Sequence, residues 1–279
     1  MKETMSLAEE PYMVVIKQYF RLIMGLRLLL FLSILVLASG ACNKQTIEEV
    51  EPDLGYDYFP LTVGKYWIYE SDSILYDPVA NGTEVILIKT YIKEEIIDTI
   101  LDNSGETLYT IERSERQDLN APWEVKRQLW LSRNERQAFR NEDNLRFINL
   151  VFPPEVGTSW DGNLFFDETL IVSIAGESIE MFKSWFYEIR RRGEAFDEEG
   201  LTFPDVLEVS MADNENLIER RFAREIYAKD IGLVYRELLI LDTQCEVCCN
   251  LDFAVCEGIP WEQKAEKGFI LRQKIIEYN

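Results

Sequence analysis

The chain has 279 residues, of which 29 are basic and 50 are acidic, and its formal net charge is -21 at pH 7. This negative charge disfavours binding to nucleic acid and to anionic lipid head groups. The sequence contains no histidine, which excludes Ser-His-Asp and Cys-His catalytic systems and every histidine-ligated zinc or iron site.

The N-terminal segment carries an apolar run, LLLFLSILVLASGAC, at residues 28–42. Arg27 precedes the run and small residues close it, which is the order of parts in a secretory signal peptide. A membrane-spanning helix would need about 20 apolar residues. We therefore predict that residues 1–41 are a lipoprotein signal peptide, with Met24 as an alternative translation start. Cys42 is then the first residue of the mature protein and carries the lipid.

Residues 42–55 are polar and acidic and predict a flexible tether between the lipid and the folded domain. Several acyl chains, such as palmitate, on Cys42 would make a stable membrane anchor. Asn43 stands where inner-membrane lipoproteins of proteobacteria have Asp, which favours the outer membrane, on its periplasmic or cell-surface side. Because residues 1–41 hold four basic and three acidic side chains, the mature net charge is -22. The remaining length fits one domain at residues 56–279.

Short runs rich in β-branched and aromatic residues follow, and turn residues separate them. We expect strands at residues 85–92, 107–111, 125–131, 145–152, 170–174, 185–190 and 206–211. Turn chemistry occurs at residues 81–82, 103–105, 161–163, 175–177 and 213–214. This pattern predicts a mainly β fold, an antiparallel curved sheet in the form of a partly open barrel or a sandwich. One or two short helices are expected, the best at residues 260–267 with Gly268 as its stop, and single helical turns at 112–118 and 217–224.

Two nonamers share the pattern F-P-x-x-V-G-x-x-W. They are FPLTVGKYW at residues 59–67 and FPPEVGTSW at residues 152–160. Proline fixes the backbone, glycine permits a positive φ, and tryptophan is placed to pack on the sheet. The shared structural positions are Phe59, Pro60, Gly64, Trp67, Phe152, Pro153, Gly157 and Trp160. A duplicated half-domain would produce such a repeat, but a recurrent loop-to-strand motif is the interpretation that one shared nonamer favours.

The segment YFPLTVGKYWIYESDS and the later REIYAKDIGLVYRELLILD resemble a group of uncharacterised secreted and lipidated bacterial β-proteins of Bacteroidota type. Their common features are F-P-L-x-x-G-x-x-W-x-Y and Y-A-x-x-x-G-L-V, the second of which places Gly232 at a strand turn. The resemblance covers most of the mature chain and implies a curved antiparallel sheet. By analogy with lipoprotein carriers, such a sheet could hold an apolar ligand on its concave face. The resemblance implies no catalytic residues.

Four cysteines form the cluster CEVCCNLDFAVC: Cys245, Cys248, Cys249 and Cys256. In an exported protein, disulfides are favoured over a tetrathiolate zinc or iron-sulfur site, because free thiols persist mainly in the reducing cytosol. A bond between the neighbours Cys248 and Cys249 would close a strained ring. The expected pairings are therefore 245–248 with 249–256, or 245–249 with 248–256, in a structural loop.

Three hypotheses follow for function. The favoured one is a non-catalytic binding or envelope-structural module that holds an apolar ligand, a glycan or a protein. The second is a hydrolase of envelope or external glycans, with two carboxylates about 5 to 9.5 Å apart in a pocket. The third is a metal-dependent protein built on the cysteine loop. We assign no catalytic residue, metal or cofactor from the sequence.

Overall fold

The computed structural model describes residues 19–21, 23–27 and 52–279, and it divides the chain into two compact units, Met1–Pro52 and Asp53–Asn279. In the first unit, residues 19–21 and 23–27 are helical. Among the described residues, no helix has the length and apolar character that crossing a bilayer requires. Cys42, most of the predicted signal peptide and residues 42–51 of the predicted tether lie outside the described residues, so their assignments stay predictions.

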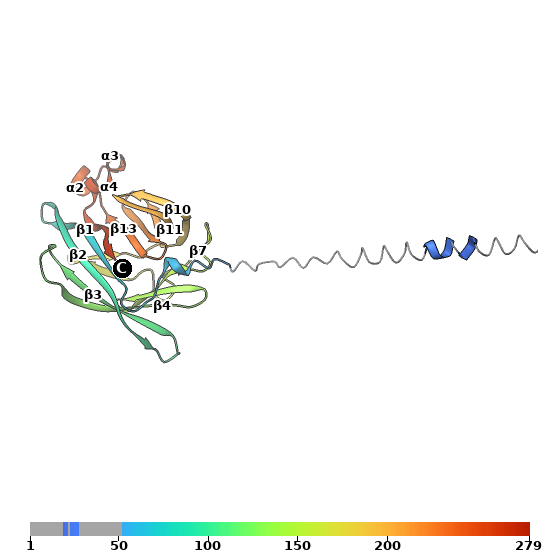
Figure 1. Cartoon of the computed structure of the whole chain (residues 1–279). Coiled ribbons are helices and arrows are strands. Elements are labelled where there is room, and N and C mark those ends of the chain that lie inside the picture. Colours follow the sequence, from blue (N-terminus) through green and yellow to red (C-terminus); the bar gives the residue numbers. More distant parts are fainter. Residues whose placement is uncertain (1–18, 22, 28–51) are drawn as a thin grey trace, which may run out of the picture. The chain divides into compact units, whose positions relative to one another are not determined.

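The second unit consists mainly of antiparallel strands (Figure 1). A short 3-10 helix, η1, spans Tyr56–Tyr58. The strands of its first part are β1 (Tyr66–Val79), β2 (Gly82–Leu101), β3 (Thr107–Arg116), β4 (Glu124–Arg133), β5 (Gln137–Glu142) and β6 (Leu145–Val151). The later strands are β7 (Ser159–Trp160), β8 (Ile171–Ile174), β9 (Glu177–Glu180), β10 (Tyr187–Glu198), β11 (Leu201–Glu215), β12 (Glu219–Ala228), β13 (Gly232–Asp242) and β14 (Lys267–Tyr278). The helices α2 (Glu246–Cys249), α3 (Phe253–Glu257) and α4 (Trp261–Lys264) lie between β13 and β14.

In the described residues, twelve strands form one sheet in the order β6-β5-β4-β3-β2-β1-β14-β13-β12-β11-β10-β7, and β8 and β9 form a separate hairpin. The sheet is not closed into a barrel. However, two hydrogen bonds connect its ends: the Ile148 N–H donates to the Gly162 carbonyl at 2.8 Å, and the Trp160 indole donates to the Ile148 carbonyl at 2.8 Å. The predicted fold class, a mainly antiparallel curved sheet with few short helices, is confirmed.

The sheet encloses a core to which both of its halves contribute. In β1 and β2 the core side chains include Trp67, Tyr69 and Ile96, and in β12 and β13 they include Tyr227 and Tyr235. Alternation of the side chains places one face of each strand inside. Aromatic rings supply much of the buried area, which stabilises a sheet of this size through removal of apolar surface from water.

Two predicted helical turns are wrong. Residues 112–118 belong largely to β3, and residues 217–224 belong largely to β12. In β12 the inward face carries the buried Arg221 and Glu225 beside Ala223, so the usual contrast between an apolar inside and a polar outside is absent. The alternation that marks a half-buried strand is therefore hidden in the sequence.

The predicted helix at residues 260–267 is shorter than expected, because α4 ends at Lys264 and β14 begins at Lys267. Gly268 does not stop a helix but lies in β14 with φ +117°, where an added Cβ would come within 2.0 Å of the Ile240 carbonyl oxygen. The predicted turn at residues 213–214 is also wrong, since both residues are in β11. The turn follows at Asn216, whose side-chain oxygen accepts the N–H groups of Ile218 and Glu219 at 2.9 Å.

Candidate functional site

The two F-P-x-x-V-G-x-x-W segments form the same hydrogen-bonded turn. In the first, the Gly64 N–H donates to Ile96 at 2.8 Å and the Lys65 carbonyl accepts from Ile96 at 2.9 Å. In the second, the Gly157 N–H donates to Ile189 at 2.8 Å, and Ile189 donates to the Thr158 carbonyl at 3.0 Å. Both glycines have positive φ, +90° and +85°. The V-G-x-x part of the repeat thus encodes one hydrogen-bonded turn, whereas the preceding Phe-Pro step differs, since the Phe152–Pro153 peptide bond is cis.

The first segment also contacts the later glycine motif. The Trp67 indole donates to the Ile231 carbonyl at 2.6 Å, and the Tyr69 hydroxyl donates to the Leu233 carbonyl at 3.0 Å. Gly232, with φ +101°, lies between these two acceptors, and a Cβ there would be 3.4 Å from Trp67. The F-P-L-x-x-G-x-x-W-x-Y motif and the Y-A-x-x-x-G-L-V motif of the sequence therefore contact each other, where β1 meets the turn before β13.

A network of buried charges occupies the interior on the side of β2 and β5. Arg140 donates two hydrogen bonds to Glu94, at 3.0 and 2.6 Å, and a third to Glu142 at 2.7 Å. Arg113 of β3 donates to the other oxygen of Glu142 at 3.0 Å. The side chains of Arg140 and Glu94 are only 8% and 5% exposed. Hydrogen-bonded pairing of this quality is what a buried carboxylate requires.

A second buried pair lies on β12 and β13. The Arg236 Nε and Nη2 are 2.7 and 2.6 Å from one oxygen of Glu225, whose side chain is 2% exposed. The Tyr227 hydroxyl donates to the other oxygen of Glu225, and the Asn149 amide donates to it at 3.3 Å. Asn149 belongs to β6, so this contact connects two strands from opposite halves of the sheet across its interior.

A cavity of ≈ 30 Å³ lies between the charged network and the contact of the two motifs, and its lining includes Trp67, Tyr69, Glu94, Arg140 and Tyr227. This volume suits about one water molecule. A drug-sized or lipid-like ligand needs about 300 Å³ or more. This cavity is therefore too small for the apolar ligand that the sequence leads us to expect on the concave face.

The carboxylates of the network are poor general acids. Burial alone would raise the pKa of Glu94, but the charge and hydrogen bonds of Arg140, with Arg113, hold the pKa below its ordinary value. Burial acts in the same way on Glu142, and Arg140 and Arg113 hold its pKa well below the usual range. A glycosidase acid instead needs a raised pKa, so that it is protonated near neutral pH. The geometry of this pair does not favour the hydrolase hypothesis.

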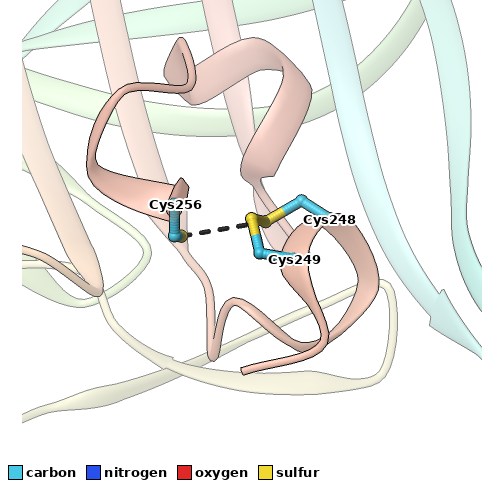
Figure 2. A group of neighbouring side chains, drawn as sticks. All are labelled: Cys248, Cys249 and Cys256. Carbon is cyan, nitrogen blue, oxygen red and sulfur yellow. Dashed lines mark hydrogen bonds between the residues drawn. A yellow bond between two sulfur atoms is a disulfide. The ribbon is translucent and has the colours of Figure 1, made fainter. Parts of the chain in front are cut away.

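The cysteine loop contains two disulfides, and their pairing differs from both expected pairings. Cys245 is bonded to Cys256, with a Cα separation of 5.9 Å, and Cys248 is bonded to Cys249. The prediction that the two neighbours are not bonded to each other is therefore wrong. The sulfur of Cys248 lies 3.7 Å from that of Cys256, along the dashed line in Figure 2. The fold decides the pairing, because it buries Cys245 and Cys256 together and leaves only the neighbours to pair.

The loop is also fixed by one carboxylate and one helix cap. The oxygens of Glu266 accept the backbone N–H groups of Gln244 and Glu246, each at 2.7 Å, and of Val247 at 2.9 Å. The Asp252 side chain caps α3 by accepting the N–H groups of Ala254 and Val255. These bonds and the Cys245–Cys256 disulfide restrain both ends of the loop.

The loop nevertheless exposes large apolar side chains. The exposed fractions of Val247, Leu251, Phe253 and Val255 are 55%, 56%, 43% and 55%. Beside the loop, an open cleft of ≈ 700 Å³ lies between the β1–β2 turn and the end of β13. Its lining combines Val79 and Val247 with polar groups, including Asp242, Glu266 and Lys267. Four exposed apolar side chains of the loop therefore lie near a cleft with a largely polar lining.

The sulfur atoms of Cys248, Cys249 and Cys256 lie within 4.8 Å of one another. Zinc and iron-sulfur sites use thiolates, and sulfurs that share a disulfide are not thiolates. The hypothesis of a metal site therefore applies only to the reduced loop.

The aromatic segment at residues 184–187 has one buried and one exposed face. Trp185 and Tyr187 are buried, whereas Phe186 is 60% exposed. The alternation in the sequence predicts that Phe186 faces away from the other two, and the structure shows that the inner face belongs to the core. The Tyr187 hydroxyl donates to the Asn163 side chain at 3.2 Å, so the buried face of this segment packs within the domain.

No protein-family model matches this chain, and no curated protein matches it significantly. Among solved structures, a "putative lipoprotein" from Parabacteroides distasonis ATCC 8503 has a TM-score of 0.34 and 11% identity, covering 80% of this chain and 98% of its own. A "putative exported protein with YmcC-like fold" from Bacteroides fragilis NCTC 9343 has a TM-score of 0.33 and 8% identity, covering 79% of this chain and 98% of its own. At this level of likeness, no family is assigned to the chain.

Sequence reasoning did not identify the charged network. Glu94, Arg140 and Glu225 are ordinary among so many charged residues, because most such side chains are solvated. The available signal is their position inside runs of β-forming residues, such as Glu94 between Ile92 and Ile96. Period-two alternation places Ile92, Glu94 and Ile96 on one face of β2, and this face is buried.

Proposed function

We infer that this protein is a lipid-anchored protein of the bacterial cell envelope that binds a partner protein through its cysteine loop, and that this binding requires no catalytic residue. The anchor is supported by the order of basic residue, apolar run, small residues and Cys42. Asn43 supports placement at the outer membrane. The folded domain then faces the periplasm or the cell surface.

The observation that carries the binding role is the rigid loop with four exposed apolar side chains beside an open cleft. Isolated exposed apolar residues are common, but a group held on a disulfide-bonded projection is typical of an interaction site. Glu246, Asp252 and Glu257 surround it and are exposed. These charges repel anionic lipid and favour a partner with an apolar centre and a basic rim.

A carboxylate-dependent hydrolase is the alternative. Glu94 lines the small cavity, but Arg140 occupies both of its oxygens. A substrate sugar would need to displace an arginine from a space that suits about one water molecule. The binding role therefore fits the geometry better.

The anchor is tested by labelling cells with radioactive palmitate. We expect Cys42→Ala to remove the label and to shift the protein out of the membrane fraction. Ser39→Leu is the matched control, because Leu is the usual residue at that position of a lipoprotein signal, and it should keep the label. Unchanged labelling of Cys42→Ala would contradict the anchor.

The loop is tested by a photo-crosslinking residue at position 253 in intact envelopes, with position 101 as the control. Leu101 is 73% exposed and lies at the end of β2. We expect one defined adduct from position 253 only, and we expect excess purified mature protein to compete it away. A competitor carrying Phe253→Ser and Val255→Ser should fail to compete. The same adducts from both positions, or equal competition by the variant, would contradict the proposed surface.

A further inference from the structure

We propose that the two disulfides of the cysteine loop form a thiol–disulfide exchange site, in which Cys248–Cys249 reacts with an external dithiol and opens the buried Cys245–Cys256 bond. This activity goes beyond the proposed binding role and does not depend on it. It rests on the unequal exposure of the two disulfides and on the contact between them.

The exposures divide the four cysteines into two pairs. Cys245 and Cys256 are 0% exposed, so an external thiol cannot reach them directly. Cys248 and Cys249 are partly exposed. Because disulfide exchange requires a thiolate to approach one of the two sulfurs, only the exposed pair can react with a reagent in solution while the loop is folded.

The contact between the pairs provides the route inward. The Cys248 sulfur lies 3.7 Å from the Cys256 sulfur (Figure 2). Reacting atoms in a near-attack arrangement are about 3–3.5 Å apart, so a small shift brings a Cys248 thiolate to Cys256. Cys249 lies close as well, since all three sulfurs fall within 4.8 Å.

The exchange can be written as balanced steps. An external dithiol gives two electrons and two protons to Cys248–Cys249, which becomes two thiols, and the dithiol becomes a disulfide. The Cys248 thiolate then attacks the Cys256 sulfur, and Cys245 leaves as a thiolate that takes up a proton. Next, the Cys249 thiolate attacks Cys248 and releases Cys256. The sum is a re-formed Cys248–Cys249 bond and a reduced Cys245–Cys256 pair.

A buried cation lies next to the inner pair. The Lys264 side chain is 4% exposed, and its Nζ is 3.5 Å from the Cys256 carbonyl oxygen. This contact places the lysine side chain against the backbone of Cys256. The carboxylate of Glu266, by contrast, accepts backbone N–H groups of the loop.

Opening the inner bond has a structural consequence. The Cys245–Cys256 disulfide connects the end of β13 to α3, the helix that carries Phe253 and Val255. Once this bond is broken, α3 keeps the Asp252 cap, short-range backbone bonds and the Lys264 contact to the Cys256 carbonyl, but it loses its covalent link to β13. The redox state of the loop would thus control how rigidly its apolar side chains are displayed.

The test follows the reduction of the mature chain by excess dithiothreitol. Samples are quenched with acid and alkylated, and peptide mass spectrometry measures the appearance of thiols at Cys245 and Cys256. We expect the Cys248→Ser/Cys249→Ser variant to slow their appearance by about tenfold or more, because the route through the exposed pair is removed. The matched control, Ala254→Ser at an exposed position of the same loop, should react at the wild-type rate. Thermal unfolding of each variant checks that the domain is folded.

A second variant makes the test independent of loop stability. In Cys249→Ser, Cys248 keeps a thiol 3.7 Å from Cys256. We expect disulfide mapping without reductant to find a fraction of molecules with a Cys248–Cys256 bond and a free Cys245. Opening of Cys245–Cys256 in the double variant at the wild-type rate or faster would overturn the proposal. So would a Cys249→Ser protein that contains Cys245–Cys256 alone.

Discussion

The two F-P-x-x-V-G-x-x-W segments form the same turn but continue differently. Trp67 opens β1, a strand of 14 residues between β2 and β14, whereas Trp160 ends β7, a strand of two residues beside β10. The residues after Trp67 continue to alternate, and those after Trp160 are Asp161-Gly162-Asn163, which form a turn. The comparison teaches that the motif encodes the start of a strand and that the following residues set its length.

The likeness of the two regions extends to the sheet. Each turn bonds to the next strand of its own half of the large sheet, β2 or β10. The last strand of the second half, β14, pairs with β1, which carries the motif of the first half. In the same way, Ile148 of β6, the last strand of the first half, bonds to the β7 segment, which carries the motif of the second half. An isolated recurrent turn would not require this arrangement, whereas a duplicated half-domain would. The topology thus favours duplication over the recurrent turn that the sequence alone favours.

The largest expected difference in stability concerns the residues two positions before Ile96 and Ile189, the isoleucines to which the two turns bond. Glu94 precedes Ile96 in the first half, and Tyr187 precedes Ile189 in the second. We expect Glu94→Ala to lower the free energy of unfolding by about 3–5 kcal/mol, because it leaves Arg140 buried without its main partner. Tyr187→Phe, which loses only the bond to Asn163, should cost about 1 kcal/mol.

Urea unfolding followed by tryptophan fluorescence measures both changes. The double variant Glu94→Leu/Arg140→Met removes both charges and should recover most of the loss. Equal costs for Glu94→Ala and Tyr187→Phe would show that the two positions are equivalent in energy, contrary to the comparison.

The pH dependence should differ between the same two positions. The folded-state pKa values of Glu94 and Glu142 lie below their ordinary values. Their contribution to stability is therefore present above the unfolded pKa of about 4.3 and is lost as the pH falls through the folded pKa. Between about pH 5 and pH 2, the unfolding free energy should fall less steeply in Glu94→Gln than in the wild type. Tyr187→Phe should keep the wild-type slope, and urea midpoints across this range measure it.

A smaller difference is expected for the two tryptophans. Trp67→Phe leaves the Ile231 carbonyl without its donor in a buried position and should cost about 2 kcal/mol. Trp160→Phe removes the bond to Ile148 at a half-buried position and should cost about 1 kcal/mol. Melting temperatures of the two variants measure the difference. A larger loss of stability for Trp160→Phe than for Trp67→Phe would mean that the copy of the motif at β7 contributes more to stability than the copy at β1.

The smallest difference is expected at the shared glycines. Gly64 and Gly157 both have positive φ, and a Cβ at either position would meet no atom within 4 Å. Alanine at either site should cost about 1–2 kcal/mol, from backbone strain alone. The two costs should agree within the error of chemical denaturation. Gly232→Ala is the contrasting control, because its Cβ would also be 3.4 Å from Pro60 and Trp67 and should cost more. Clearly unequal costs at Gly64 and Gly157 would argue against a common turn.

The strand prediction was most successful where one face of a strand is apolar. The runs at residues 85–92, 125–131 and 206–211 fall within β2, β4 and β11. It succeeded at residues 107–111 of β3 but failed at residues 112–116 of that strand and at β12. The inner faces there carry Arg113 in β3 and Arg221 and Glu225 in β12. Charges inside a sheet are compatible with the fold because other strands supply their partners, such as Arg236 of β13 for Glu225. Such partners are invisible in the pattern of a single strand.

The sequence by itself determined the mainly β fold, the two copies of one turn and the cysteine-rich loop, because these depend on local backbone preferences and on neighbours along the chain. Only the tertiary structure decided the pairing of the four cysteines, the packing of Trp67 against Gly232, and the small size of the interior cavity. Each of these depends on which distant residues come into contact when the sheet curves. Spacing along the chain does not specify that contact, since it arises from the burial of both halves in one core.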